Sequence, residues 1–164
     1  MNRPSQLMVE VDAFRVARDA VFLASELSAA LAVCVYDESQ AVGGMLHLRY
    51  VATGEDGPLD LTDNTLSSDL LLMDRFCKEL RGLGARKQSW RVSIFAHTPP
   101  SPNMHEPAAT VIDLVKAYYA DSRLAVTCKE FNRPGAIVVH LDAREGRTWV
   151  DAAPAPTTPQ LSAL

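Results

Sequence analysis

The amino-acid sequence predicts an α+β domain in which two main helices pack in layers on mixed or antiparallel sheet. The order of apolar patterns is roughly β-β-β-β-α-β-α-β-β-β, so strand hairpins flank the helices instead of alternating with them. The chain has 164 residues, of which 48% are hydrophobic and 22% are charged. That length and balance are ordinary for one globular domain with a substantial core.

The first half of the chain contains short apolar runs that alternate or are continuously apolar. A turn at 37–40 separates two of them and indicates a hairpin whose second strand contains Gly43 and Gly44, typical of a bulge or a close backbone approach. The predicted strands or strand-like runs are 8–14, 20–23, 31–36 and 42–50; residues 1–7 are expected to be a loose leader, 25–30 a loop or short helical turn, and 53–62 a loop.

Two helical patterns lie in the middle of the chain. The first is an apolar stripe at three- and four-residue steps that ends near Gly82 or Gly84. Its inward residues are predicted to be Leu66, Leu70, Met73, Phe76, Leu80 and Leu83. The second helix is expected to begin at Pro107, with Val111, Ile112, Val115 and Tyr118 inward. The four prolines between His97 and Pro107 predict an irregular loop before it.

The last third of the chain returns to strand patterns, and the segment after them is rich in proline. The predicted strands outside the first half are 90–96, 124–131, 136–141 and 148–150. We therefore expect a single domain over 8–151 and a proline-rich disordered tail over 152–164.

Charge and cysteine content limit the function classes. A net charge of −4 is unfavourable for nucleic-acid binding, and the longest uncharged run is too short for insertion into a membrane. Cys34, Cys77 and Cys128 are widely spaced, which is typical of reduced core thiols in a cytoplasmic protein. The histidines at 47, 97, 105 and 140 match no metal-ligand spacing, so we expect no metal and no other cofactor.

The hairpin from Leu31 to Leu48 resembles the signature of the CheD family, the bacterial chemoreceptor glutamine deamidases. That signature has the form G-S-C-V-x-V-C-hydrophobic-x-D, then a short turn, then hydrophobic-G-G/A-M-x-H. The helix end Arg81–Arg86 and the order of later elements are also similar, so the resemblance covers roughly residues 9–151. It implies a layered α/β/β sandwich.

The resemblance also implies a chemistry. In the family a cysteine thiolate attacks the side-chain amide of a receptor glutamine, ammonia leaves, and water hydrolyses the thioester to glutamate. A histidine activates the thiol and a threonine assists. His47 matches that histidine, Gly43 and Gly44 match the glycines before it, and Cys34 matches the second cysteine of the strand.

Two of the three catalytic side chains are absent from the matching positions. Ala30 stands where the family has its nucleophilic cysteine, and Ala24 stands where it has the threonine. Ser28 and Ala29 replace the glycine and serine before the cysteine. Cys34 is not expected to substitute, because four residues of extended chain place it about 13 Å from position 30.

These substitutions favour a non-catalytic CheD-like binding module in bacterial chemotaxis or related signalling. Its binding surface would surround Ser28, Ala30, Gly43, Gly44 and His47. The resemblance implies a chemoreceptor or a CheC-like phosphatase as protein partner, although an unrelated signalling protein is also compatible.

Two alternatives stay open. The chain is an active protein-glutamine deamidase if Ser28 or Ser25 acts as a relocated nucleophile with His47, which requires a hydroxyl about 3 Å from the imidazole. Otherwise the resemblance is a shared scaffold only, and the proline-rich segment 97–107 carries a separate interaction.

Overall fold

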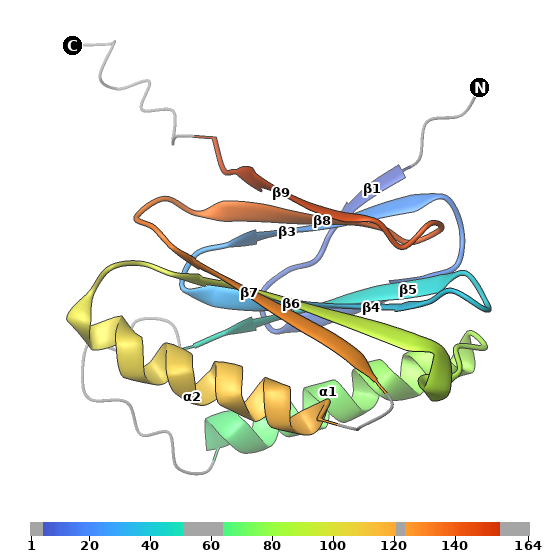
Figure 1. Cartoon of the computed structure of the whole chain (residues 1–164), viewed down its shortest axis with the longest axis horizontal. Coiled ribbons are helices and arrows are strands. Elements are labelled where there is room, and N and C mark those ends of the chain that lie inside the picture. The colour runs from blue at the N-terminus through green and yellow to red at the C-terminus, as the bar shows by residue number, and fades with distance from the viewer. Residues whose placement is uncertain (1–4, 51–63, 121–123, 155–164) are drawn as a thin grey trace.

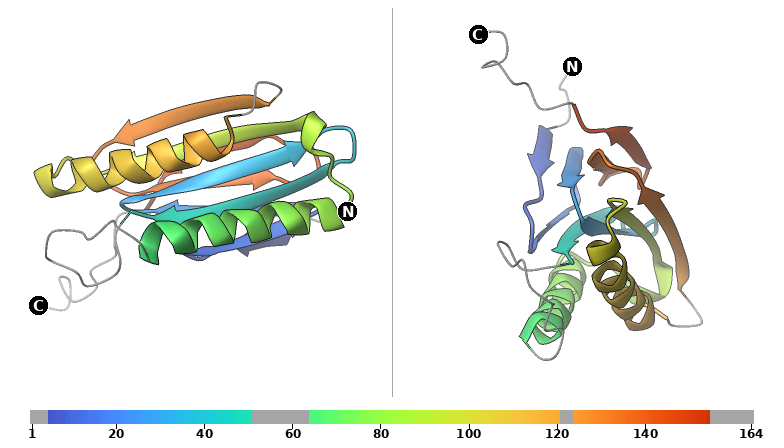
Figure 2. Two further views of the ribbon diagram at one scale, coloured as in Figure 1. Left: turned by 90° about the horizontal axis from the view of Figure 1, so that it is seen from below. Right: turned by 90° about the vertical axis from the view of Figure 1, so that its left-hand side faces the viewer.

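Two β-sheets stack face to face, and two helices cover the outer face of one of them (Figure 1). The computed structural model describes residues 5–50, 64–120 and 124–154. The helices lie side by side below the second sheet, while the first sheet forms the opposite outer layer (Figure 2). The predicted α+β layered class with two main helices is therefore confirmed.

The first sheet has the strand order β1-β3-β8-β9, and its strands come from both ends of the chain. β1 and β3 are parallel and the other neighbours antiparallel. The strands are β1 (Ser5–Met8), β3 (Val21–Leu27), β8 (Ile137–Asp142) and β9 (Thr148–Ala152).

The second sheet has the order β2-β5-β4-β6-β7 and carries the helices. β6 and β7 are parallel, and the remaining pairs are antiparallel. Its strands are β2 (Ala13–Ala17), β4 (Ala30–Asp37), β5 (Val42–Arg49), β6 (Trp90–Thr98) and β7 (Ala125–Asn132). The helices are α1 (Asn64–Gly82), α2 (Pro102–Tyr118) and the short 3-10 helix η1 (Lys87–Ser89).

The central strand β4 is buried along its whole length and contributes to both cores. Leu31, Val33 and Val35 pack toward the helices. Ala30, Ala32 and Cys34 face the first sheet. Because successive residues of a strand point to opposite faces, the continuous apolar run predicted at 31–36 is the pattern of a strand covered on both sides.

The N-terminal strand prediction needs correction. Residues 8–14 do not form one strand; β1 ends at Met8, and a turn leads to β2 in the other sheet. Asp12 has a positive φ of 57° in this turn, and the amide of Val9 donates to the carbonyl of Ala24 at 2.7 Å. The alternating pattern therefore belongs to a crossover between sheets. Part of the expected leader, Ser5 to Leu7, lies in β1.

Residues 25–30 were expected to be a loop or short helical turn, and this prediction is also wrong. β3 continues to Leu27 and β4 begins at Ala30, leaving a two-residue connection. Ala29 adopts a φ of 53° there, which lets the chain reverse within two residues. The predicted loop 53–62 lies outside the described residues.

The first helix confirms most of its predicted stripe, with one correction at its start. Met73, Phe76 and Leu80 are fully buried, but Leu70 is 39% exposed and Asp69 is 6% exposed. Asp69, one position before Leu70, fits nearly the same helical spacing, so periodicity alone did not show which of the two residues is buried.

The proline-rich segment is shorter than predicted. β6 extends through Thr98, and α2 begins at Pro102, five residues before the expected start. Proline fits the first turn of a helix, where its missing N–H would have no intrahelical partner. The inward residues Val111, Ile112 and Val115 are buried as predicted, and Tyr118 is half-buried. Among the described residues, no helix is both long and apolar enough to cross a membrane.

We predict that Gly44→Ala destabilises the protein by about 1–3 kcal/mol, because a Cβ would overpack the contact between β5 and α1. A Cβ at Gly44 would lie 2.7 Å from the Phe76 ring and 3.1 Å from the carbonyl oxygen of Arg15. Gly82→Ala is the matched control, since no atom lies within 4 Å of its Cβ position at the end of α1. Urea unfolding should show a loss only for Gly44→Ala; equal stabilities would contradict this packing.

Candidate functional site

His47 lies between the two sheets. It is on β5, opposite Ala32 of β4, and shares a face with Met45 of the inter-sheet core. Its side chain is buried, and Nδ1 is 3.0 Å from the carbonyl oxygen of Val9. Since a carbonyl only accepts, Nδ1 carries the proton and Nε2 of the neutral ring is an acceptor. Burial lowers the pKa of His47, against the opposing effects of the Val9 hydrogen bond and the Asp12 and Glu10 charges.

Ala30 is a diagonal cross-strand neighbour of His47. It begins β4, pairs with Arg49, and shares the inter-sheet face with Ala32, the residue directly opposite His47. Diagonal neighbours on one face of an antiparallel pair are about 7–8 Å apart, within reach of longer side chains. The sheet pairing therefore brings the two sequence-predicted positions together, and the side chain at position 30 is a buried methyl group.

Ser25 and His47 form hydrogen bonds to the same carbonyl oxygen, that of Val9. Oγ of Ser25 lies 3.0 Å from the oxygen of Val9 and 3.2 Å from Sδ of Met45. The Ser25 hydroxyl and the His47 ring nitrogen are therefore at most about 6 Å apart, each with the Val9 carbonyl as acceptor. Ser28 is exposed in the turn between β3 and β4, and no hydrogen bond joins it to His47 among the described residues.

Cys34 is also diagonal to His47, because it pairs with Met45. Its thiol is buried, and desolvation raises its pKa well above the usual range. The separation of about 13 Å from position 30 therefore does not place Cys34 out of reach of His47. Burial is what disfavours its thiolate. All three cysteines are free thiols; Cys34 and Cys77 are buried as expected for core residues, whereas Cys128 is only partly buried.

Three of the other predicted residues lie away from the His47 ring. Ala24 pairs with His140 and faces the opposite side of β3 from Ser25. Gly43 and Gly44 are four and three residues from His47 along β5, which corresponds to about 13 and 10 Å. Gly43 packs closely on the backbone of Ala143, so both glycines have a packing role where they stand.

His97 is a structural residue that the sequence interpretation placed in a loop. It is fully buried near the end of β6. The amide of Ala29 donates to its Nδ1 at 3.1 Å, and its Nε2 donates to the carbonyl of Arg133 at 2.8 Å. His97 thereby ties the turn before Ala30 to the turn between β7 and β8. The Ala29 amide that donates to His97 lies in a turn where φ of Ala29 is positive, and no sequence pattern indicated this turn.

The other two histidines lie elsewhere. His105 is exposed on α2, and His140 stacks on Trp149 and lies 3.1 Å from Asp151. Within the described ranges, no group of three or more His, Cys, Asp or Glu residues is arranged to hold a metal ion.

An ion pair stands at the rim of the His47 region. Nε of Arg49 is 2.7 Å from Oδ2 of Asp12, and about a third of each side chain is exposed. Asp69 of α1 is buried nearby, and its Oδ2 has no hydrogen-bond partner. Burial raises the pKa of Asp69 to about 7, with the Asp12 charge adding to the rise and Arg49 opposing it.

The chain is distantly similar to one well-defined relative. It is 24% identical over 126 residues to the Probable chemoreceptor glutamine deamidase CheD 1 of Ruegeria sp. (strain TM1040). The match covers 77% of this chain and 65% of the relative, so it spans slightly less than two thirds of the relative's length. No family model matches the chain. The predicted resemblance is thus supported as a distant CheD-like relationship.

Two solved structures are weakly similar to this chain. The Bacillus licheniformis hypothetical protein YfiH gives a TM-score of 0.49 at 8% identity, covering 73% of this chain and 51% of its own. The Neisseria meningitidis protein NMB0706, of family-model DUF152, gives 0.47 at 8% identity, covering 80% and 64%. At these values neither similarity bears on function.

We predict that the stability difference between Asp69→Asn and the unsubstituted protein depends on pH. In the unfolded chain Asp69 ionises near pH 4, whereas in the folded protein it stays protonated to about pH 7. Raising the pH across this window therefore destabilises the native protein, while Asp69→Asn stays neutral. Between pH 4 and 7, the free energy of unfolding of Asp69→Asn should rise relative to that of the unsubstituted protein by about 1.4 kcal/mol for each pH unit.

The exposed carboxylate of Asp113 on α2 provides the matched control. Asp113→Asn should unfold in urea with a pH profile parallel to that of the unsubstituted protein. A parallel profile for Asp69→Asn as well would mean that the Asp69 carboxylate is ionised in the folded state.

Proposed function

We propose that this chain is a CheD-like protein-binding module that does not catalyse glutamine deamidation. The distant similarity to a CheD protein supports the module. The observation that carries the loss of catalysis is the buried methyl group of Ala30 beside His47, at the position where the family resemblance implies the nucleophile.

The proposed loss follows from the chemistry of amide hydrolysis through a thioester. A thiolate must attack the amide carbon, ammonia must leave, and water must release the acid. Neutral His47 has Nε2 available as an acceptor, so a base is present, but a methyl group forms no bond to the amide carbon. The thiol of Cys34 is held in its protonated form by burial.

A relocated serine is the second candidate, because Ser25 and His47 share the Val9 carbonyl. As a nucleophile, Ser25 would have to give its proton to His47 instead of the carbonyl, and its Oγ is fully buried on β3. Ser28 is accessible, but among the residues that the structure describes no hydrogen bond links it to a base. These arrangements favour binding over a serine-based deamidase.

The proposed docking surface is the rim at the Ala30 end of the inter-sheet space. Ser28 and the Arg49–Asp12 pair are accessible there, and the buried imidazole of His47 lies behind them. In keeping with the CheD resemblance, the proposed partner is a chemoreceptor helix or a CheC-like phosphatase.

We expect no ammonia release above background when the purified protein is incubated with a glutamine-bearing chemoreceptor fragment. An enzyme-coupled ammonia assay should give the same rate for the unsubstituted protein, His47→Ala and the exposed control His105→Ala. A rate that His47→Ala abolishes and His105→Ala retains would establish a deamidase and overturn the pseudoenzyme proposal; Ser25→Ala and Ser28→Ala would then identify the nucleophile.

We also expect Ser28→Trp to weaken binding to the chemoreceptor fragment or to a CheC-like phosphatase at least about tenfold, since a bulky side chain would obstruct the proposed rim. Gln88→Trp is the control, because Gln88 is exposed in η1 at the opposite end of the sheet. Affinity measured by calorimetry should fall only for Ser28→Trp. Equal affinities for both variants, or no binding to either partner class, would contradict this assignment.

A further inference from the structure

A cavity of about 180 Å³ lies at the other end of the molecule from Ala30. It is enclosed by β4, β6 and β7 of the second sheet and by the β8–β9 hairpin of the first. Arg91, Ala125 and Thr127 are exposed, so the cavity opens to solvent beside β7. Its lining includes Cys34, Tyr36, Arg91, Ser93, Thr127 and Thr148.

Hydroxyl groups from three strands line this cavity. Ser93 of β6 and Thr127 of β7 are register partners, and Thr148 of β9 lines the cavity from the other sheet. None of the side-chain hydrogen bonds found between described residues includes these three hydroxyls. A small concave site with a few polar groups from separate elements is the usual form of a ligand pocket.

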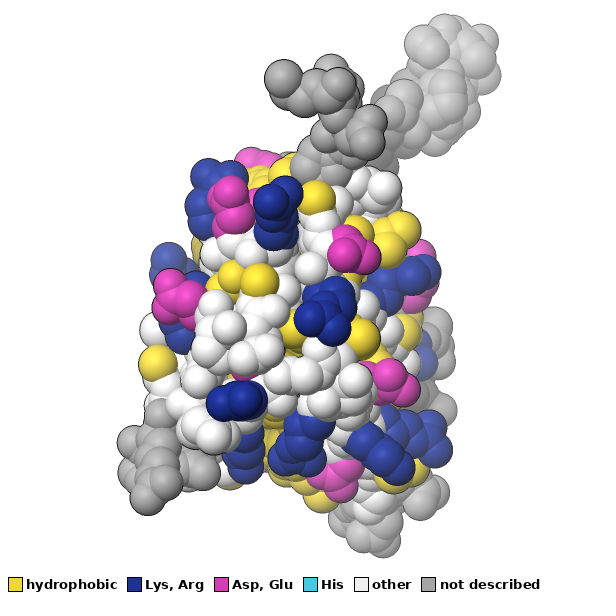
Figure 3. All heavy atoms as spheres, turned by 90° about the vertical axis from the view of Figure 1, so that its right-hand side faces the viewer, with side chains coloured by type: hydrophobic (Ala, Val, Ile, Leu, Met, Phe, Trp, Pro, Cys, Tyr) yellow, Lys and Arg dark blue, Asp and Glu magenta, His cyan; other side chains and the backbone are white. Residues whose placement is uncertain are grey.

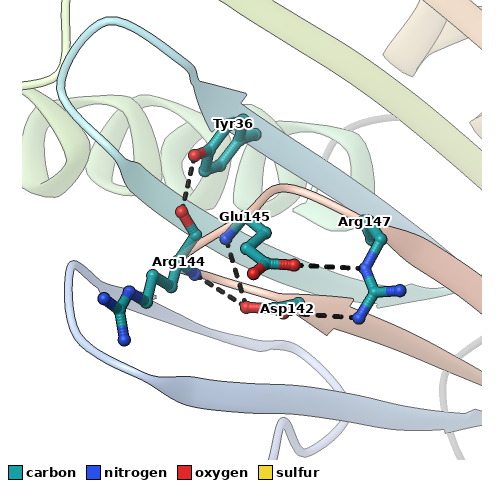
Figure 4. A network of polar contacts seen from close by, with 5 residues as sticks. All are labelled: Tyr36, Asp142, Arg144, Glu145 and Arg147. Carbon is teal, nitrogen blue, oxygen red and sulfur yellow. Dashed lines mark hydrogen bonds and ion pairs between the residues drawn. The ribbon is translucent and has the colours of Figure 1, made fainter.

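Arg91 supplies the cation at the cavity mouth, and the neighbouring contacts hold its position. Its guanidinium lies 5.4 Å from the centre of the Tyr36 ring. The Tyr36 hydroxyl donates to the carbonyl of Arg144 at 2.7 Å (Figure 4). The ring also covers Gly146, whose Cβ position would be 2.3 Å from it. The ion pairs among the described residues do not use Arg91.

Two of the nearby carboxylates have other partners. Asp142 accepts from the amides of Arg144 and Glu145 and faces Arg147 (Figure 4). Asp37 accepts from Ser39 and from the amide of Arg86. Glu38 is exposed in the β4–β5 turn. Lys and Arg side chains are spread over the face that carries these turns, with Asp and Glu between them (Figure 3).

We propose that this cavity binds a small organic oxyanion, a molecule with a carboxylate or phosphate group that pairs with Arg91. Guanidinium recognises either group through paired N–H donors, and the hydroxyls of Ser93, Thr127 and Thr148 supply further hydrogen bonds. The volume equals that of about six water molecules, which limits the ligand to the size of a small metabolite. Cys34 lines this cavity and is also a diagonal neighbour of His47, but the polar groups of the proposed site lie on β6, β7 and β9, and the site does not depend on the function proposed for the His47 region.

Two-dimensional amide NMR of the full chain tests the proposal, with succinate as the carboxylate, glycerol 3-phosphate as the phosphate and succinamide as the neutral control. We expect saturable shifts for at least one oxyanion at the amides of Arg91, Ser93, Thr127 and Thr148, and none for succinamide. The oxyanion with the lower dissociation constant identifies the preferred group.

Arg91→Gln should weaken binding of that oxyanion by about tenfold or more, and Thr127→Val by a smaller factor. Arg75→Gln, an exposed arginine on α1, should bind like the unsubstituted protein. The spectra of the variants also report whether each remains folded. Absence of saturable shifts with both oxyanions, equal shifts with succinamide, or unchanged binding by folded Arg91→Gln would overturn the proposal.

Discussion

The carbonyl oxygen of Val9 is the point on which the geometry around His47 depends. Val9 follows the last residue of β1 in the first sheet, and the chain then crosses to β2 in the second. Its oxygen accepts from Ser25 of the first sheet and from His47 of the second, both at 3.0 Å. One buried acceptor therefore links the sheets and sets the tautomer of the imidazole. It also accepts the hydrogen of the Ser25 hydroxyl, and breaking that bond would leave a buried donor without an acceptor, which is costly.

The close packing of the sheets has opposite consequences at the two ends of β4. At one end, Ala30 and Ala32 present only methyl groups to His47, and the first sheet covers them. At the other end, Tyr36 and Arg91 border an open cavity beside the exposed strand β7. Small side chains thus close the space at the position that resembles a catalytic site, while polar and apolar side chains together line an open space at the opposite end.

Several features were predictable because they follow from local patterns. The continuous apolar run of β4 indicated a strand covered on both faces, and the stripes in α1 and α2 identified Met73, Phe76 and Val111 as inward residues. The predictions for the helices were wrong where two residues fitted the local pattern equally well. Asp69 and Leu70 satisfy nearly the same helical spacing, and only the contact of α1 with the second sheet selects the buried one. Pro102 and Pro107 both suit an early helical turn, so the start of α2 was ambiguous.

The amino-acid sequence by itself determined the layered α+β class, the strand that carries Cys34, the hairpin that carries His47, and the presence of alanine at position 30. These are matters of periodicity and residue identity along a continuous segment. Only the tertiary structure decided that Ser25 and His47 share an acceptor, that His97 ties the Ala29 turn to Arg133, and that Arg91 borders a cavity with Thr127 and Thr148. Each of these contacts joins residues far apart in the chain, so it arises from strand order and sheet stacking, for which local sequence patterns carry no signal.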